Sequence, residues 1–204
     1  MNTNIEYGFV SICLSEERCS PAGSVTVKQV ADLSVDGQRH RILTVARRNL
    51  QNTLRIMWFL KAHDIELYRL SATLIPLATH ELTQDWAWWD EESLCEIGEK
   101  IGRVARMNGY RLSSHLPELC GLTGSETFKW AQAYLDYHQR LFNMMGLDET
   151  TKIILHLGGA YGDKDKALKT AIKNLEQLSS WARARIVLEN DDRTFTIEDV
   201  LQVA

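Results

Sequence analysis

The sequence lacks the features that mark membrane and secreted proteins. Its 204 residues contain no apolar run near the roughly eighteen residues that indicate a membrane-spanning helix. The N-terminus has neither the basic start nor the long apolar segment of a secretion signal. These absences predict a cytoplasmic protein that makes no contact with a membrane.

Cysteine is scarce and is spaced for neither disulfides nor zinc. The four cysteines are Cys13, Cys19, Cys95 and Cys120, and no two of them form a Cys-x-x-Cys pair. This spacing argues against a zinc knuckle and against a disulfide framework, and it favours reduced thiols in the cytoplasm.

An excess of basic residues is also absent. The 23 lysines and arginines are outnumbered by 27 acidic residues, which gives a net charge of −4. Nucleic-acid-binding domains are usually basic, so the composition gives no support for DNA binding. A local basic face can still bind DNA, and metal-binding carboxylates themselves add negative charge.

What the sequence does contain is a regular alternation of short apolar runs with longer amphipathic segments. The apolar runs, bounded by polar or glycine-containing turns, predict strands at Tyr7–Cys13, Glu66–Ser71, Tyr110–His115, Lys152–Leu157 and Arg185–Glu189. The segments between them predict helices at about Arg39–His63, Asp90–Asn108, Ser125–Met145, Asp163–Leu178 and Thr196–Val203.

Five βα units in succession predict a parallel sheet, because parallel strands are joined through crossover helices. No Gly-x-Gly-x-x-Gly follows the first strand, which disfavours a dinucleotide-binding doubly wound sheet. A complete (βα)8 barrel typically needs about 250 residues. We therefore expect an α/β fold: an incomplete TIM barrel that forms one domain over residues 1–204 and lacks its last three βα units. Its open sheet edge would favour self-association.

Four potential metal ligands fall at or just after the ends of predicted strands. His80 follows the second strand, His115 ends the third, His156 lies near the end of the fourth, and Glu189 ends the fifth. The carboxyl ends of barrel strands converge on one face, so these side chains are expected to share a site. Three imidazoles and a carboxylate suit zinc or manganese. A single histidine at a strand end is more often structural, and it is the recurrence in successive units that favours ligation.

Other conspicuous residues leave two interpretations open. Trp86, Trp88 and Trp89 either anchor a loop on the barrel rim or form a stacking platform for bases, and the anchor is favoured. Lys164 follows the glycine-rich run after the fourth strand, where it either meets a DNA phosphate or is simply solvated. His138 lies on the apolar side of a helix and is predicted to be a hydrogen-bonded core residue.

Several motifs together resemble the UV damage endonuclease family. They are Gly8–Val10, Cys19–Pro21, Arg69–Ser71, Leu74–His80, Met144–Glu149, His156–Lys164 and Leu188–Arg193. The resemblance spans nearly the whole chain, and the last two motifs are fairly specific in combination. It implies a TIM barrel with a cluster of divalent metals, typically manganese, that incises damaged double-stranded DNA immediately 5′ of a UV photoproduct or a similar lesion.

The resemblance also implies roles for individual residues. His80, His115, His156 and Glu189 match metal ligands of the family. His115, His156, Glu189 and Lys164 are the residues expected to act in catalysis. The family's later strands bring further ligands, an Asp-x-His pair, a modified Lys, a His and a Glu, that this sequence does not contain. We therefore expect the 204-residue chain alone to be nearly inactive.

The residues expected to contact the lesion or the DNA depart in part from the family. Phe9 matches a position that often carries an aromatic residue near the lesion, and Tyr161 and Lys164 lie in the glycine-rich motif. After the third strand, however, Glu118 and Leu119 stand where the family usually has Gln and an aromatic residue. An acid is repelled by the DNA backbone, and Leu stacks on a base less well than Tyr. Leu119 remains suited to act as an apolar wedge.

Two other functions stay open from the residues themselves. One is a sugar isomerase or epimerase, because related barrels use similar ligands to bind a metal that polarises a sugar hydroxyl. The other is a non-catalytic remnant that binds DNA or a partner. A small closed pocket at the ligands would favour the first, and weak or absent metal binding would favour the second.

Overall fold

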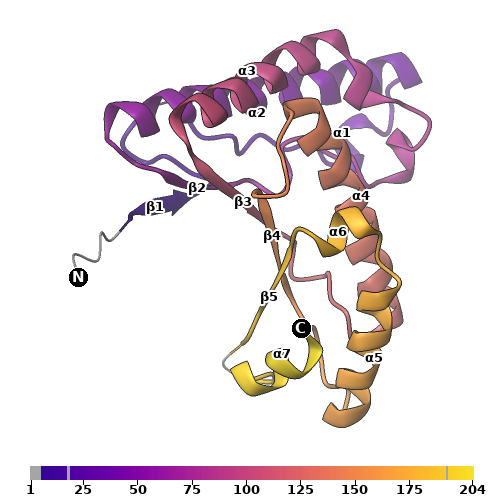
Figure 1. Ribbon diagram of the computed structural model, residues 1–204. Helices are drawn as coiled ribbons and strands as arrows, with labels where there is room; N and C mark the ends of the chain where they lie inside the picture. Colours follow the sequence, from indigo (N-terminus) through magenta and orange to yellow (C-terminus); the bar gives the residue numbers. More distant parts are fainter. Residues whose placement is uncertain (1–5, 18, 192) are drawn as a thin grey trace. The chain divides into compact units, whose positions relative to one another are not determined.

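The computed structural model describes residues 6–17, 19–191 and 193–204 (Figure 1). Its strands are β1 Gly8–Val10, β2 Leu67–Leu70, β3 Arg111–His115, β4 Lys152–His156 and β5 Ile186–Glu189. Its helices are α1 Val27–Val30, α2 Val35–Ala62, α3 Glu92–Asn108, α4 Ser125–Met145, α5 Lys164–Glu176, α6 Ser180–Arg183 and α7 Ile197–Val203, with 3-10 turns η1 Glu81–Thr83 and η2 Trp88–Asp90. Every strand and helix predicted from the sequence is present.

Within the described residues the strands form one five-stranded sheet in the order β1-β2-β3-β4-β5. The pairings of β1 with β2, of β3 with β4 and of β4 with β5 are all parallel. An order that follows the chain is that of a barrel wall, whereas a doubly wound sheet reverses direction at its switch point. The predicted fold class is therefore confirmed. The two edge strands are β1 and β5, so these residues do not close a barrel.

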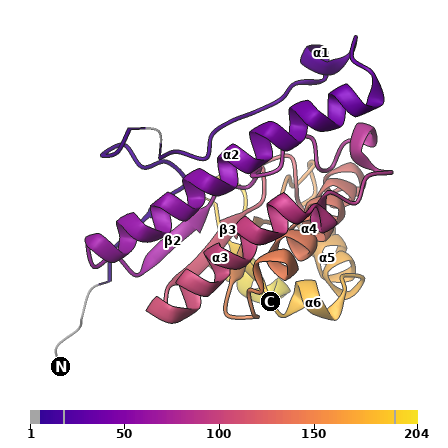
Figure 2. The ribbon, with the colours of Figure 1, turned by 90° about the horizontal axis from the view of Figure 1, so that it is seen from above.

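The chain divides into two compact units, of which the first contains residues 1–112 and 140–148. In this unit α2 and α3 lie side by side (Figure 2). They bury fully enclosed apolar side chains such as Leu50 and Ile56 of α2 and Ile101 of α3. A Cβ atom at Gly102 would lie 1.7 Å from the carbonyl oxygen of Met145. Glycine is thus required where the end of α4 approaches α3.

The helix α2 starts four residues earlier than the sequence pattern predicted. Ser34 caps it, because its hydroxyl accepts a hydrogen bond of 3.2 Å from the backbone N–H of Gly37. The sequence pattern did not reveal this start, because Gly37 in the first turn disfavours a helix. Although α2 has 28 residues, it carries many charges. No helix in the described part of the chain is both long enough and apolar enough to cross a membrane.

The tryptophan cluster of the first unit anchors a loop, as favoured from the sequence. Trp86 and Trp88 are 6% and 1% exposed. The indole N–H of Trp86 donates a hydrogen bond of 2.7 Å to Glu91. The guanidinium of Arg140 lies 3.9 Å from the ring centroid of Trp89, the third member. Two of the three rings are therefore enclosed by protein and present no stacking surface to a base.

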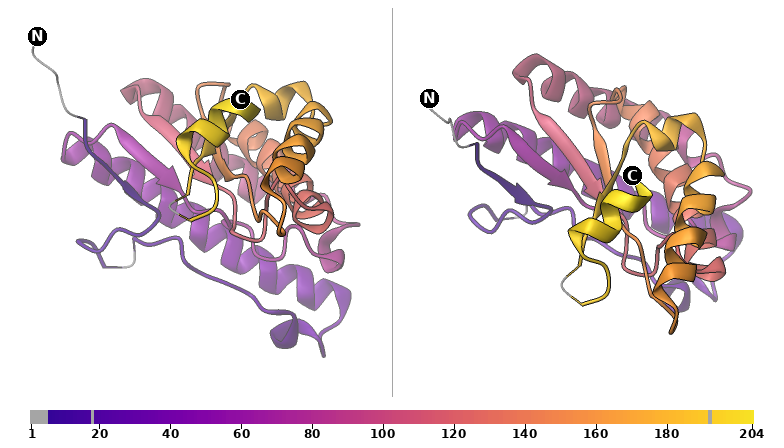
Figure 3. Two further views of the ribbon diagram at one scale, coloured as in Figure 1. Left: turned by 90° about the horizontal axis from the view of Figure 1, so that it is seen from below. Right: turned by 60° about the horizontal axis from the view of Figure 1, so that its bottom comes forward.

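The second unit contains residues 113–139 and 149–204. In it, α7 lies against both α5 and β5 (Figure 3). The helix α5 begins at Asp163, whose carboxylate accepts a hydrogen bond of 3.0 Å from the backbone N–H of Lys166. Along β4, Ile153 and Leu155 are buried while the alternate residues are half-buried. The alternation places His156 on the face of β4 opposite these two core residues.

Candidate metal centre

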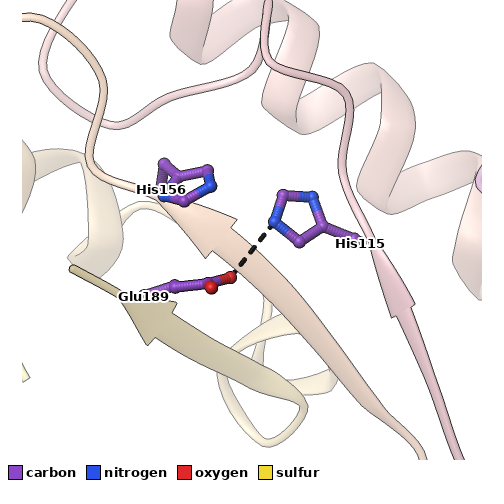
Figure 4. A group of neighbouring side chains, drawn as sticks. All are labelled: His115, His156 and Glu189. Atoms are coloured by element: carbon purple, nitrogen blue, oxygen red, sulfur yellow. Dashed lines mark ion pairs between the residues drawn. The ribbon is translucent and has the colours of Figure 1, made fainter. Parts of the chain in front are cut away.

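Three of the four predicted ligands come together at the carboxyl ends of β3, β4 and β5. In the strand ladder His115 pairs with Ile154, and His156 pairs with Glu189. Residues two apart in a strand share a face, so His115, His156 and Glu189 project from the same face of the sheet. Figure 4 shows their side chains pointing toward one another. One potential ligand atom from each lies within 4.8 Å of the others.

The ring of His115 is held in one tautomer. Its Nδ1 lies 2.6 Å from the carbonyl oxygen of Leu116, so Nδ1 carries a hydrogen, and in the neutral ring Nε2 presents a lone pair. That Nε2 lies 3.2 Å from Oε2 of Glu189. Two acceptors at this distance repel each other unless a proton or a cation lies with them. Metal–donor distances of about 2.0–2.2 Å put neighbouring ligands of one ion roughly 3 Å apart.

The ring of His156 lies beside that of His115, with 5.0 Å between the centroids. Its Nδ1 is buried and has no hydrogen-bond partner among the described residues. An unsatisfied buried nitrogen costs roughly 1–3 kcal/mol. Two imidazoles and one carboxylate whose potential ligand atoms lie this close together fit a divalent cation such as Mn²⁺ or Zn²⁺.

Asp191 adds negative charge next to this cluster and shapes the loop after β5. Its carboxylate accepts hydrogen bonds from the backbone N–H groups of Arg193, Thr194 and Phe195. Burial alone would raise the pKa of Asp191, but these three donors outweigh it, and nearby His156 adds to them, so the pKa is lowered. In the sequence Asp191 is recognisable only as part of the motif Leu188–Arg193, and nothing there signals this role.

His80, the fourth predicted ligand, belongs to the first unit and caps a 3-10 turn. Its Nδ1 accepts a hydrogen bond of 3.2 Å from the backbone N–H of Leu82. In the neutral ring the hydrogen then resides on Nε2, which leaves no free lone pair. Metal ligation by His80 would require this cap to open, and its membership of the metal site stays a prediction.

Lys164 is paired within the protein. Its Nζ lies 2.6 Å from Oδ2 of Asp199 and 5.8 Å from the ring centroid of Phe195. The hydrogen bond from Lys164 is the largest cause of the lowered pKa of Asp199. The ion pair joins the first turn of α5 to α7. The predicted catalytic and DNA-binding roles of Lys164 stay predictions, and they would require its ammonium to leave Asp199 or to be shared with it.

The two aromatic residues predicted to meet DNA differ in exposure. Tyr161 is 67% exposed and has a φ of 49°. A side chain in this left-handed conformation is uncommon and stores local strain. Phe9 is half-buried and packs edge-on against Phe59 and Tyr68, with centroids 6.0 and 5.2 Å away. Only Tyr161 offers most of its ring to a partner in this arrangement, and both roles stay predictions.

Glu118 and Leu119 occupy the tip of a turn after β3. The turn is closed by a hydrogen bond of 2.9 Å from the backbone N–H of Cys120 to the carbonyl of Pro117. Both residues at the tip are exposed, Leu119 by 44%. An exposed Leu on a tight turn is the placement that an apolar wedge needs. A role in lesion binding stays a prediction for both.

Comparison with known proteins decides the family. The family model described as UV-endonuclease UvdE matches residues 5–204. The chain belongs to the UvdE family. The resemblance inferred from the motifs is thereby confirmed.

The UvdE relatives match over almost the whole of this chain. The UV DNA damage endonuclease of Bacillus pumilus (strain SAFR-032) is 36% identical over 200 residues, which cover 97% of this chain and 61% of the relative. The UV DNA damage endonuclease of Bacillus thuringiensis subsp. konkukian (strain 97-27) is 32% identical over 202 residues, covering 98% and 62%. The crystal structure of SacUVDE matches with a TM-score of 0.85 at 29% identity, covering 98% of this chain and 65% of SacUVDE. The chain thus spans less than two thirds of the length of each.

Proposed function

We propose that this chain is the metal-binding part of a DNA-repair endonuclease that incises double-stranded DNA on the 5′ side of UV photoproducts. The observation that carries the proposal is the cluster of His115, His156 and Glu189 at the strand ends of a UvdE-family fold. The relatives' name, UV DNA damage endonuclease, supplies the substrate and the reaction.

The cofactor we propose is Mn²⁺, held by His115, His156 and Glu189. When bound, a divalent cation polarises a phosphodiester and makes a neighbouring water more acidic. Neighbouring residues of the chain orient the proposed ligands and add negative charge around them. Nδ1 of His115 donates to the carbonyl of Leu116, which leaves Nε2, beside Glu189, as the ring nitrogen available to a cation, and Asp191 places a second negative charge near His156. These groups lower the cost of collecting positive charge at the strand ends.

The partner we propose is damaged duplex DNA lying across the same strand ends. Tyr161 offers an exposed ring for stacking, and Leu119 offers an apolar wedge. Phe9 and Glu118 are proposed to contact the lesion, and Lys164 is proposed to contact a phosphate after exchanging its partner Asp199.

Metal binding is the first test. The free Mn²⁺ signal in electron paramagnetic resonance is followed as the 204-residue chain is titrated into MnCl₂. We expect the signal to fall with wild type and to fall much less with Glu189→Gln, which keeps the shape and removes the charge. The matched control is Glu198→Gln, an exposed glutamate of α7 outside the cluster. Equal binding by wild type and Glu189→Gln would count against the site.

Lesion recognition is the second test. Binding of the Mn²⁺-loaded chain to one duplex, irradiated or not irradiated with ultraviolet light, is measured by fluorescence anisotropy. We expect tighter binding to the irradiated duplex and, for Tyr161→Ala, a loss of that preference. Equal affinity for the two duplexes would contradict a lesion-specific function. In plasmid nicking we expect this chain alone to be nearly inactive, and robust lesion-specific nicking would contradict that expectation.

No observation favours a sugar isomerase. A cavity of about 180 Å³ does exist in the second unit, but it lies between the glycine-rich loop and α5. Its lining is Thr123, Ala160, Tyr161, Asp163, Lys166, Ala167 and Thr170. Because this lining includes none of the three clustered ligands, the cavity does not provide the closed pocket that metal-dependent sugar chemistry requires.

A further inference from the structure

The strand β3 carries one polar residue in a row that is otherwise apolar. Leu112, Ser114 and Leu116 alternate along the strand and its continuation, and they are 4%, 0% and 1% exposed. A hydroxyl in so buried a position is costly unless it is hydrogen-bonded. Ser114 also directly precedes His115, the ligand that β3 contributes to the proposed metal centre.

The partner of Ser114 is His138 on α4, which is itself 0% exposed. Oγ of Ser114 lies 2.8 Å from Nε2 of His138, and Nδ1 of His138 lies 2.7 Å from the carbonyl oxygen of Tyr134. The carbonyl can only accept, so Nδ1 carries the hydrogen and Nε2 is the acceptor. The Ser114 hydroxyl therefore donates to His138. Burial lowers the pKa of His138 to about 4, which keeps the ring neutral in this role.

This hydrogen bond restrains β3 in a direction that the sheet does not. The ladder to β4 fixes the strand within the plane of the sheet, where His115 pairs with Ile154 and the N–H of Leu116 donates to the carbonyl of Ile154 at 2.9 Å. Side chains stand roughly perpendicular to a sheet, so the bond from Ser114 to His138 acts out of that plane. An apolar pair would fill the same space but would impose no preferred direction or distance.

We propose that His138 and Ser114 are positioning residues for the metal ligand His115. Their hydrogen bond fixes the distance between the end of β3 and α4, and this brings Nε2 of His115 within 3.2 Å of Glu189. Neither residue touches the proposed metal, so neither is catalytic. The inference rests on the proposed metal site and adds the part of the core that holds one of its ligands in place.

Four variants separate positioning from general stability. Ser114→Ala removes the donor. His138→Gln keeps an acceptor at about the place of Nε2, whereas His138→Asn is too short to reach Ser114. Leu178→Ala is the stability control, because it truncates a buried side chain that follows the carboxyl end of α5, remote along the chain from β3.

The first readout is the titration of each variant with Co²⁺, followed by its visible absorption, which reports the ligand geometry. We expect Ser114→Ala and His138→Asn to bind about tenfold more weakly than wild type and with an altered spectrum, as is usual when a ligand loses its support. His138→Gln should restore most of the affinity. Leu178→Ala should lower the melting temperature with wild-type affinity and spectrum.

The second readout needs no metal and distinguishes failure of the two proposals. In the metal-free chain, the ¹⁵N chemical shifts of the His115 ring report its hydrogen bond to Leu116 and its contact with Glu189. We expect them to move in Ser114→Ala and His138→Asn and to stay in Leu178→Ala. Absence of Co²⁺ binding by wild type would reject the metal site alone. Unchanged His115 shifts and Co²⁺ affinity in both Ser114→Ala and His138→Asn would overturn the positioning role.

Discussion

The second unit contains two kinds of histidine, which differ in burial and in the hydrogen-bond partners of their ring nitrogens. His138 is enclosed in the core, and both of its ring nitrogens have hydrogen-bond partners. His115 and His156 stand at strand ends, where Nε2 of one faces a carboxylate and Nδ1 of the other has no partner among the described residues. The same fold that satisfies both nitrogens of His138 leaves Nδ1 of His156 unsatisfied among the described residues. The proposed metal site accounts for this contrast, because a binding site can hold unsatisfied polar groups at a cost to the stability of the metal-free chain.

The largest expected effect is on metal binding by His115 and His156. His156→Ala removes one proposed ligand, and we expect the affinity for Mn²⁺ to fall by at least about 100-fold, beyond the 10–100-fold typical of supporting residues. In wild type, Mn²⁺ at about 100 times its Kd should stabilise the fold by about 2.7 kcal/mol. Differential scanning fluorimetry with and without Mn²⁺ measures this. An equal Mn²⁺-dependent shift in His156→Ala would show that the cation binds elsewhere.

The enclosed His138, by contrast, should stabilise the fold even in the absence of metal. His138→Leu leaves the Ser114 hydroxyl and the Tyr134 carbonyl without this partner in a buried environment. We expect the free energy of unfolding to fall by about 2–3 kcal/mol. Urea denaturation followed by circular dichroism is the measurement. Wild-type stability in His138→Leu would mean that the bonds of His138 contribute nothing to the fold.

The pH dependence of stability sharpens the same contrast. The pKa of His138 is lowered to about 4 in the folded chain from 6.5, so the unfolded chain binds more protons between these values. The contribution of neutral His138 is therefore present above pH 6.5 and is lost as the pH falls toward 4. Between pH 7 and pH 5 we expect wild type to lose about 2 kcal/mol more than His138→Leu, from the unfolding free energies of both proteins. Parallel pH profiles would contradict the buried neutral state.

The smallest expected effect has the opposite sign. In the presence of EDTA, His156→Leu replaces a partly unsatisfied imidazole by an apolar side chain of similar size. We expect the metal-free chain to gain about 1 kcal/mol, because an unsatisfied buried nitrogen is removed. Urea midpoints of the two proteins without metal measure the difference. A marked loss of stability in His156→Leu would show that His156, like His138, stabilises the fold.

Most of the fold was accessible from the sequence because the periodicity is strong. The helix α4 was predicted with both of its ends, and the starts of α5 and α7 coincide with their capping residues Asp163 and Thr196. The short helices α1 and α6 were missed, since four residues are too few to show a helical period. The start of α2 was missed because its cap at Ser34 is followed by a glycine in the first turn.

The proximity of three of the candidate ligands was predictable from the sequence, and their local contacts were less so. His115, His156 and Glu189 were found because strand ends of a barrel converge, and His138 was correctly assigned to the core. The sequence does not reveal that His80 caps a turn or that Lys164 pairs with Asp199, because both contacts depend on local loop geometry. The polar Ser114 in an apolar row was the available signal for the bond to His138.

In the proposed site, His115, His156 and Glu189 bind one divalent cation. Crystals of the 204-residue chain soaked in MnCl₂ and measured at the manganese absorption edge test this most directly. We predict an anomalous peak within about 2.0–2.3 Å of His115 Nε2, of a ring nitrogen of His156 and of a carboxylate oxygen of Glu189. A manganese peak at another place, with these three side chains unligated, would contradict the account.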